Sequence, residues 1–151
     1  MREPTIIFDI DGTLADVSKR VKYLQGEKKD RGKFYEGVED DEVIQPIADL
    51  LRAVDHSYQP FLQLVCVTAR PERTWYDTVR WLNEKAGFDP YKILMRADDD
   101  DRAEAEVKRE LVEFLRRERY PIVLAFANQD EVVKMYRDMG IPCCQVSESA
   151  Y

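Results

Sequence analysis

The chain has 151 residues, of which 30 are acidic and 23 basic, so its formal net charge is −7. With 44% hydrophobic residues at this length it can bury a core without disulfides, and we expect one domain that spans residues 1–151. No apolar run approaches the roughly 20 residues of a membrane span. The three cysteines have no metal-binding spacing, which suits a reducing compartment. We therefore expect a cytoplasmic protein with no membrane partner, whose acidity excludes a broad nucleic-acid interface.

Short apolar, β-branched runs recur along the chain and alternate with helical patterns. The runs predict strands at residues 5–8, 61–67, 91–95, 122–126 and 143–146. Apolar side chains at helical spacing predict helices around residues 47–54, 75–82, 107–115 and 132–139, and Gly87 and Gly140 stand where helix C-terminal caps are expected. This alternation predicts an α/β fold: a doubly wound, mostly parallel five-stranded sheet with helices on both faces. Ligands should then bind at the carboxyl ends of the strands.

Two charged segments interrupt this alternation. Residues 18–43 show no clear element pattern, and we expect an irregular insert there. Residues 19–33 contain seven basic and two acidic side chains, so their net charge is +5. The rest of the chain therefore has a net charge of −12. Such a segment can form a small basic patch on an otherwise acidic protein. The second segment, residues 98–101, consists of aspartates that we expect to form a solvated loop and to cap the following helix.

The strongest chemical signal directly follows the first predicted strand, in Asp9-Ile10-Asp11-Gly12-Thr13. Two carboxylates two residues apart, where a buried strand ends and a glycine turn begins, can converge on one cation at the edge of a parallel sheet. One of them can attack a substrate while the other handles protons. The alternative is an Asp-rich turn that only caps the next helix.

This segment resembles the first motif of the haloacid dehalogenase superfamily of phosphotransferases, Asp-x-Asp-Gly-Thr. Thr68 ends a predicted strand, as in the second motif of that superfamily, and Lys108 lies on a later helix, where the third motif places a lysine. The resemblance implies a Rossmann-like fold. Since the chain leaves room for at most a small cap, we expect the site to be open.

Over nearly the whole chain, the sequence resembles the phosphatase domain of phage-type polynucleotide kinase-phosphatases. In that family an arginine follows the second motif's hydroxyl residue by two positions, as Arg70 does here, and another follows the second motif-one aspartate by nine, as Arg20 does. Residues 132–146 are similar to the family's closing helix and strand. A phage-encoded member would work in the host cytoplasm.

The resemblance implies a role for each matched residue. Asp9 is expected to be the nucleophile that forms an aspartyl-phosphate, and Asp11 the general acid and later the base. Lys108 is expected to stabilise negative charge on the phosphoryl group. For Lys108 the alternative is an exposed helix lysine paired with Glu104.

The remaining matched residues are expected to bind the substrate phosphate. Thr68 would donate a hydrogen bond, Arg70 and Arg20 would clamp phosphate oxygens, and Gly12 and Thr13 belong to the same turn. The alternative for Arg20 is one more solvated charge in a basic loop.

Carboxylates beside a phosphate imply a divalent cation, and Mg²⁺ is the ordinary choice, with Asp9, Asp11 and Asn128 as predicted ligands. The sequence departs from the family at this point. The family's fourth motif places acids just after the penultimate strand, where this chain has Ala127 and Asn128. An amide oxygen can bind Mg²⁺ but carries no charge, so metal affinity should be lower. Asp130, two residues further on, is an alternative ligand.

The leading hypothesis is a Mg²⁺-dependent phosphomonoesterase that acts on nucleic-acid 3′-phosphate ends or on nucleotides, with no obligate protein partner. The alternative is a catalytically impaired or inactive phosphate-binding module on the same fold, because Ala127 and Asn128 replace acids. A receiver-type phosphoacceptor fits poorly, since receivers carry the accepting aspartate after a middle strand. Here the predicted middle strand, residues 91–95, is followed by Arg96.

Overall fold

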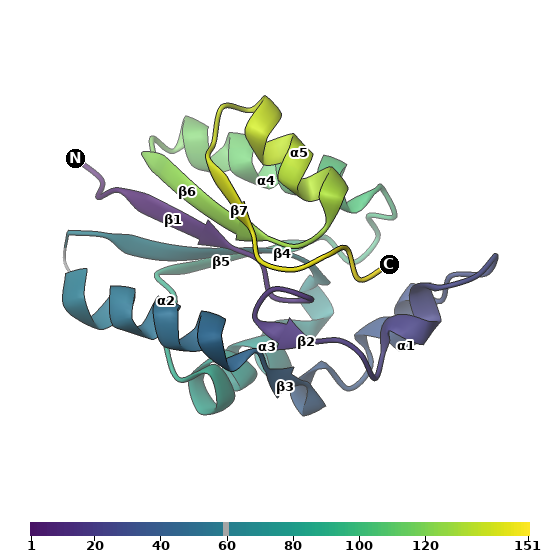
Figure 1. Cartoon of the computed structure of the whole chain (residues 1–151). Coiled ribbons are helices and arrows are strands. Elements are labelled where there is room, and N and C mark those ends of the chain that lie inside the picture. Colours follow the sequence, from purple (N-terminus) through teal and green to yellow (C-terminus); the bar gives the residue numbers. More distant parts are fainter. Residues whose placement is uncertain (59–60) are drawn as a thin grey trace.

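A computed structural model describes residues 1–58 and 61–151. Its centre is a five-stranded sheet in the order β5-β4-β1-β6-β7, in which every neighbouring pair is parallel (Figure 1). The strands are β1 (Thr5–Phe8), β4 (Gln63–Pro71), β5 (Lys92–Arg96), β6 (Ile122–Ala127) and β7 (Cys143–Gln145). The predicted α/β, doubly wound parallel sheet is confirmed, with β1 in its middle.

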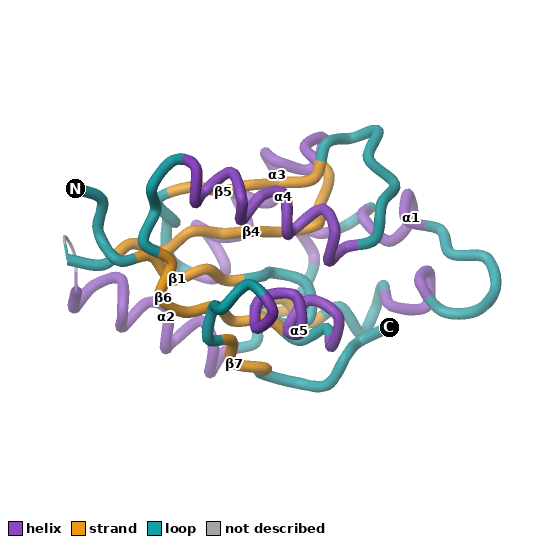
Figure 2. Tube along the Cα trace, turned by 90° about the horizontal axis from the view of Figure 1, so that it is seen from above, coloured by secondary structure: helices purple, strands orange, loops and turns teal. Residues whose placement is uncertain are grey.

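Helices cover both faces of the sheet, as parallel crossovers require. Figures 1 and 2 show α4 and α5 on one face and α2 and α3 on the other. Their bounds are α2 (Gln45–Tyr58), α3 (Trp75–Trp81), α4 (Glu104–Arg117) and α5 (Asp130–Asp138). Side chains alternate along β1, so Ile7 joins the core under α4 and α5, while Ile6 and Phe8 join the core over α2 and α3.

The strand that carries Thr68 and Arg70 differs most from its prediction. Phe61 is 72% exposed and precedes the strand, because β4 begins at Gln63. β4 then continues to Pro71, which pairs with Arg96 of β5 beyond an irregularity in the register. Both site residues therefore lie inside β4, beyond the end of its pairing with β1 at Cys66. Gly87 and Gly140 end helical segments with φ of 82° and 75°, as predicted.

Residues 18–43, predicted as an irregular insert, form a small cap that contains only short elements. The cap holds α1 (Arg31–Tyr35), and β3 (Glu42–Val43) pairs antiparallel with β2 (Ala15–Asp16). These elements are too short to show a helical or strand period in the sequence. Their buried apolar side chains form a cluster of their own: Val17, Leu24, Phe34, Tyr35 and Val38.

The aspartates before α4 do not cap this helix, contrary to the prediction. α4 begins after Ala103, whose side chain makes no capping hydrogen bond. Asp100 instead accepts hydrogen bonds from the Arg102 side chain, the shortest at 2.7 Å, and Asp98 accepts one from the backbone N–H of Arg73 at 2.7 Å. These contacts hold the loop against the end of β4.

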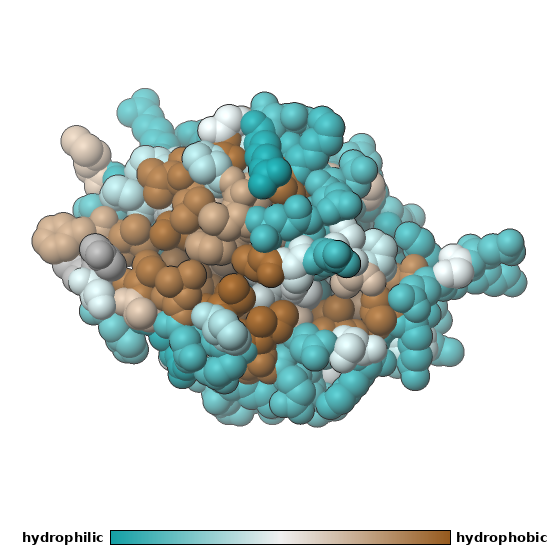
Figure 3. Space-filling view, viewed as in Figure 1, coloured by the Kyte–Doolittle hydropathy of each residue, from teal (hydrophilic) through white to brown (hydrophobic). Residues whose placement is uncertain are grey.

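The surface of the molecule is mostly polar. Figure 3 shows apolar side chains gathered in one area of this view, over the strands above α2. Leu124 and Val146 are half-buried members of the core on that side. Among the described residues, no helix is both long enough and apolar enough to cross a membrane.

Candidate active site

The predicted site residues gather at the carboxyl edge of the sheet. Asp9 directly follows β1, Asn128 directly follows β6, and Thr68 lies in β4. Because β1 pairs in parallel with both β4 and β6, these three positions are neighbours at one edge. The backbone N–H of Asp9 donates to the carbonyl of Phe126 at 3.1 Å, which fixes the two strand ends together.

Asp9 is a buried carboxylate that contacts one cation. It is 1% exposed; its Oδ1 accepts the backbone N–H of Ile10 at 2.8 Å, and its Oδ2 pairs with Nζ of Lys108. Burial raises the pKa of Asp9 to about 7, with Glu104 and Asp11 acting in the same direction and Lys108 against it. The pKa of Asp9 therefore lies well above that of an ordinary carboxyl group, in spite of the contact with Lys108.

Lys108 is fully buried and contacts two acids, Asp9 and Glu104. Glu104 lies one helical turn earlier and accepts a hydrogen bond from Nζ of Lys108 at 2.6 Å. Burial alone lowers the pKa of Lys108, but Asp9 and Glu104 outweigh it and raise this pKa above its ordinary value. The Glu104 pair expected for an exposed lysine therefore exists, but inside the protein and joined to Asp9.

Asp11 is held by two buried arginines. Arg70 donates to its carboxylate from Nη2 at 2.8 Å and from Nε at 3.2 Å, and Nη2 of Arg20 donates at 2.9 Å. Arg20 is 5% exposed, so it is not a solvated charge of the cap. Burial tends to raise the pKa of Asp11, but Arg70 and Arg20 outweigh it and lower this pKa below its ordinary value.

Asp41 completes this charge network and was missed from the sequence. Its carboxylate accepts hydrogen bonds from Nε of Arg20 at 2.9 Å and from Nη2 of Arg70 at 3.3 Å, and its backbone carbonyl accepts one from the Trp81 indole at 2.9 Å. Burial raises the pKa of Asp41, against the effect of Arg20. Residues 39–42 are all acidic, and no pattern in this run distinguishes the buried one.

Asn128 lies against the turn that follows Asp9. It is fully buried, and its Oδ1 accepts a hydrogen bond from the Thr13 hydroxyl at 3.4 Å. Gly12 packs directly on it, since a Cβ at Gly12 would stand 2.2 Å from Nδ2 of Asn128. On the other side, the buried Thr68 hydroxyl accepts the backbone N–H of Arg70 at 3.2 Å.

Asp130 and Ala127 lie outside this group. Ala127 is the last residue of β6 and packs in the core under α4 and α5. Asp130 begins α5 on the surface, where its carboxylate accepts a hydrogen bond from Gln145 at 2.7 Å and its N–H donates to Ser149 at 2.8 Å. The structure thus places Asn128 beside the Asp9 turn and directs the Asp130 carboxylate to the outer edge.

The site is covered, so the prediction of an open site is wrong. The segment 147–151 crosses the sheet edge: the Ser147 hydroxyl donates to the Gly12 carbonyl at 3.1 Å, and Gln129 binds the backbone of Ala150 and Tyr151. The Tyr151 hydroxyl donates to Oε2 of Glu104 at 2.9 Å. The cap is small, as predicted, but this second segment and the cap together bury the acids.

Comparison with known proteins agrees with this geometry. A model of the polynucleotide kinase PNKP phosphatase domain matches residues 3–151. The chain belongs to this PNKP phosphatase-domain family. Its fold is also that of haloacid dehalogenase hydrolases, which the sequence motifs predicted.

Solved structures share the fold of this PNKP phosphatase domain. A chain of the Pnkp1/Rnl/Hen1 RNA repair complex superimposes with a TM-score of 0.81 at 24% identity, covering 99% of this chain and 44% of that one. The domain thus spans less than half of that relative. A haloacid dehalogenase-like hydrolase from Streptococcus pneumoniae has a TM-score of 0.63 at 16% identity, covering 93% and 83% of the two chains. The class C acid phosphatase from Bacillus anthracis with tungstate bound has a TM-score of 0.58 at 18% identity, covering 97% of this chain and 69% of that one.

Replacing Gly12 with alanine should destabilise this PNKP phosphatase domain by more than the backbone strain alone. Gly12 has a φ of 78°, and an added Cβ would clash with Asn128. The strain costs about 1–3 kcal/mol, and the clash adds to it. Gly26→Ala is the matched control, because Gly26 has a φ of 85° and nothing within 4 Å of an added Cβ. Equal free energies of unfolding for both variants, measured in urea, would contradict the contact with Asn128.

Asp9 should make the metal-free domain less stable as the pH rises from about 4 to 7. The unfolded chain releases this proton near 3.8, whereas the folded protein holds it up to about 7. The folded state therefore binds more protons in this window, and its free energy of unfolding falls as the pH rises. Urea unfolding with a chelator at several pH values should show Asp9→Asn gaining stability relative to the parent as the pH increases. Parallel profiles for the two proteins would refute this.

Proposed function

We propose that the chain is a Mg²⁺-dependent phosphomonoesterase that forms an aspartyl-phosphate on Asp9. The observation that carries this proposal is a buried network of ion pairs at the end of β1, in which Asp9 pairs with Lys108 and Asp11 with Arg70 and Arg20. Asp41 and Glu104 are further partners of the same three cations. Buried cations are rare unless they meet a charge. Cations held next to two strand-end acids suit phosphoryl transfer, in which negative charge must be stabilised away from water. Membership of a phosphatase-domain family supports the same reaction class.

In the proposed reaction, a carboxylate oxygen of Asp9 attacks phosphorus and the P–O bond to the leaving group breaks. Asp11 would give a proton to the leaving oxygen, and it can carry this proton once the phosphate draws Arg70 and Arg20 from its carboxylate, because these arginines are what lower its pKa. Water then attacks the aspartyl-phosphate, and Asp11 takes up a proton from it. This second displacement breaks the bond between Asp9 and phosphorus, so inorganic phosphate leaves and both acids return to their starting state.

The remaining residues of the site would hold the phosphoryl group. Lys108 and Arg70 are fully buried next to Asp9 and Asp11, so they would supply positive charge where negative charge builds up. Arg20 would supply a second guanidinium from the cap side. Thr68 and the turn at Gly12 and Thr13 would add hydrogen-bond donors.

The donor set fits Mg²⁺ in kind, although it carries less charge than three acids would. The predicted ligands Asp9, Asp11 and Asn128 offer only carboxylate and amide oxygens, which Mg²⁺ prefers. Arg70 and Arg20 already bind the side chain of Asp11, so its oxygens are less available to a metal ion. Among the described residues, Asn128 Oδ1 accepts only a long hydrogen bond from Thr13, and it would be a metal ligand together with Asp9. Bound Mg²⁺ would supply positive charge beside Asp9 and keep its carboxylate ionised.

A non-catalytic phosphate-binding module is the second candidate. It is favoured by one observation: the buried position next to the Asp9 turn holds the neutral Asn128, while all three cations are retained. Such a module would bind a phosphate ester through Arg70 and Lys108 without turning it over.

We further propose nucleic-acid 3′-phosphate ends or nucleotides as substrates, in the cytoplasm. The family description and the similarity to a chain of an RNA repair complex support this substrate class. The basic residues of the cap, among them Lys29 and Arg31, would attract a phosphorylated end. The free thiols of Cys66, Cys143 and Cys144 suit a reducing compartment.

Two assays on the full chain test the proposal together. With Mg²⁺, phosphate release is measured from 4-nitrophenyl phosphate and from a 3′-phosphorylated oligonucleotide, and binding of the same oligonucleotide is measured with a chelator. Release that Asp9→Asn abolishes supports the enzyme. Binding without release, unchanged by Asp9→Asn, supports the module. Absence of both binding and release refutes both functions.

A further inference from the structure

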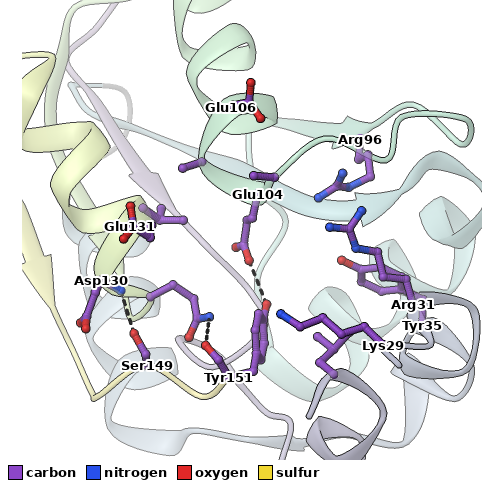
Figure 4. Close-up of a pocket in the computed structure, with 15 residues that line it drawn as sticks. Lys29, Arg31, Tyr35, Arg96, Glu104, Glu106, Asp130, Glu131, Ser149 and Tyr151 are labelled. Carbon is purple, nitrogen blue, oxygen red and sulfur yellow. Dashed lines mark hydrogen bonds between the residues drawn. The ribbon is translucent and has the colours of Figure 1, made fainter. Parts of the chain in front are cut away.

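A cavity of about 700 Å³ lies between the cap and the start of α4 and α5, next to the covered site (Figure 4). Glu104 lines this cavity and also contacts Lys108, the partner of Asp9, so the cavity adjoins the reacting group. Tyr35 and Tyr151 form part of its wall. This volume is in the range of small-ligand sites in proteins.

Arg96 is the most unusual residue of the cavity wall. It is 4% exposed, and its Nε and Nη1 donate to the backbone carbonyls of Ala69, Asp100 and Arg102 at 3.0, 2.9 and 2.7 Å. Within the described residues, it makes no salt bridge to a carboxylate. The carboxylate of Asp100, in the same loop, binds Arg102, and Arg96 acts on it only through space, as a lesser cause of its lowered pKa.

The other two buried arginines, in contrast to Arg96, both form salt bridges. Arg20 and Arg70 are buried to a similar degree, and each is paired with both Asp11 and Asp41. A buried cation that touches no carboxylate is costly, and an anionic ligand would reduce that cost. Arg96 therefore has the environment of a ligand-binding group rather than that of an internal ion pair.

Two further cations line the same side of the cavity. Arg31 donates from Nη1 to the backbone carbonyl of Asp101 at 2.6 Å, and Figure 4 shows its guanidinium beside that of Arg96, with Lys29 nearby. None of these three makes a salt bridge within the described part of the chain. The acids of the cavity stand on the opposite side of Figure 4, apart from Glu104, which is bound by Lys108 and Tyr151.

We propose that Arg96, Arg31 and Lys29 form a second anion site, which binds the internucleotide phosphate adjacent to the terminal phosphate. The identity of this ligand rests on the proposed function, since the terminal phosphate must sit at Asp9. Two guanidiniums side by side can bind phosphate oxygens with charge-assisted hydrogen bonds. Tyr35 and Tyr151 would then lie next to the nucleoside between the two phosphates.

Binding to the full chain in a chelator tests this inference without relying on turnover. The probes are a 3′-phosphorylated dinucleotide and the same molecule with an uncharged methylphosphonate in place of its internucleotide phosphate. We expect the charged probe to bind about tenfold more tightly. Arg96→Gln and Arg31→Gln should each reduce that ratio to near one.

Lys28→Gln is the matched control, because Lys28 is exposed in the same segment but does not line the cavity, and it should keep the ratio. Arg31→Gln covers the case in which Arg96→Gln fails to fold. Equal binding of both probes to the parent chain overturns the second site, while leaving phosphate release at Asp9 untouched. A preference retained in both arginine variants overturns it as well.

Discussion

Asn128→Asp is expected to raise Mg²⁺-dependent phosphatase activity by about 10- to 100-fold, the range found when the surroundings of a metal ligand change. Asn128 is fully buried and lies against the turn that follows Asp9, so an aspartate there would add a negative charge where the cation is proposed to bind. Rates with 4-nitrophenyl phosphate over a range of Mg²⁺ concentrations measure the effect. Most of the gain should appear as a lower Mg²⁺ requirement.

The same substitution makes a second, independent prediction. Without Mg²⁺, a third buried acid near Asp9 and Asp11 should lower the melting temperature, and Mg²⁺ should restore it. Gln129→Glu is the matched control, since it adds the same charge one residue further on, where the side chain binds Ala150 and Tyr151. Equal Mg²⁺ responses of the two variants would argue against Asn128 as a ligand. Asp9→Asn in the Asn128→Asp background should remain inactive.

Lys108→Met should cost about 3–5 kcal/mol of stability, the usual result of removing one partner from a buried ion pair. The substitution preserves most of the side-chain volume but leaves Asp9 and Glu104 facing each other without their shared cation. Urea unfolding in a chelator measures the loss. It should be smaller at pH 5 than at pH 8, because Asp9, with a pKa already raised to about 7, is protonated at the lower pH.

Lys134→Met separates this effect from the general loss of a helix lysine. Lys134 pairs with Asp138 at the same four-residue spacing, but both side chains are exposed on α5. Its loss should change the free energy of unfolding far less than the loss of Lys108 does, because solvent screens an exposed pair. Asp9→Asn should restore part of the stability lost in Lys108→Met. A loss of similar size in both lysine variants would show that the Asp9 contact contributes little.

Much of the site could be predicted from the sequence because it lies at the ends of strands. In a parallel sheet, the carboxyl ends of neighbouring strands meet at one edge. An aspartate after a buried run, a threonine in the next strand and an asparagine after a later strand therefore had to converge once the strands were recognised. Asp9, Thr68 and Asn128 do lie together, for this reason.

The cap could not be predicted in the same way. Its helix has five residues and its strands have two, which is shorter than the window in which a hydrophobic period is visible. From the sequence, Arg20 could be either a phosphate-binding residue or a solvated charge in a basic loop. The structure instead buries Arg20 between Asp11 and Asp41, and buries Phe34 and Tyr35 in a small apolar cluster.

The sequence by itself determined the parallel sheet, the motif after its first strand and the neutral residue at the fourth motif, because each depends on local pattern and chain order. Only the tertiary structure decided which charges are buried and what they meet. Asp41 and Arg96 each stand among other charged residues in the chain, and no local pattern separates them. Burial arises from contacts between distant segments, and it makes Asp41 a partner of two arginines and leaves Arg96 without a salt bridge among the described residues.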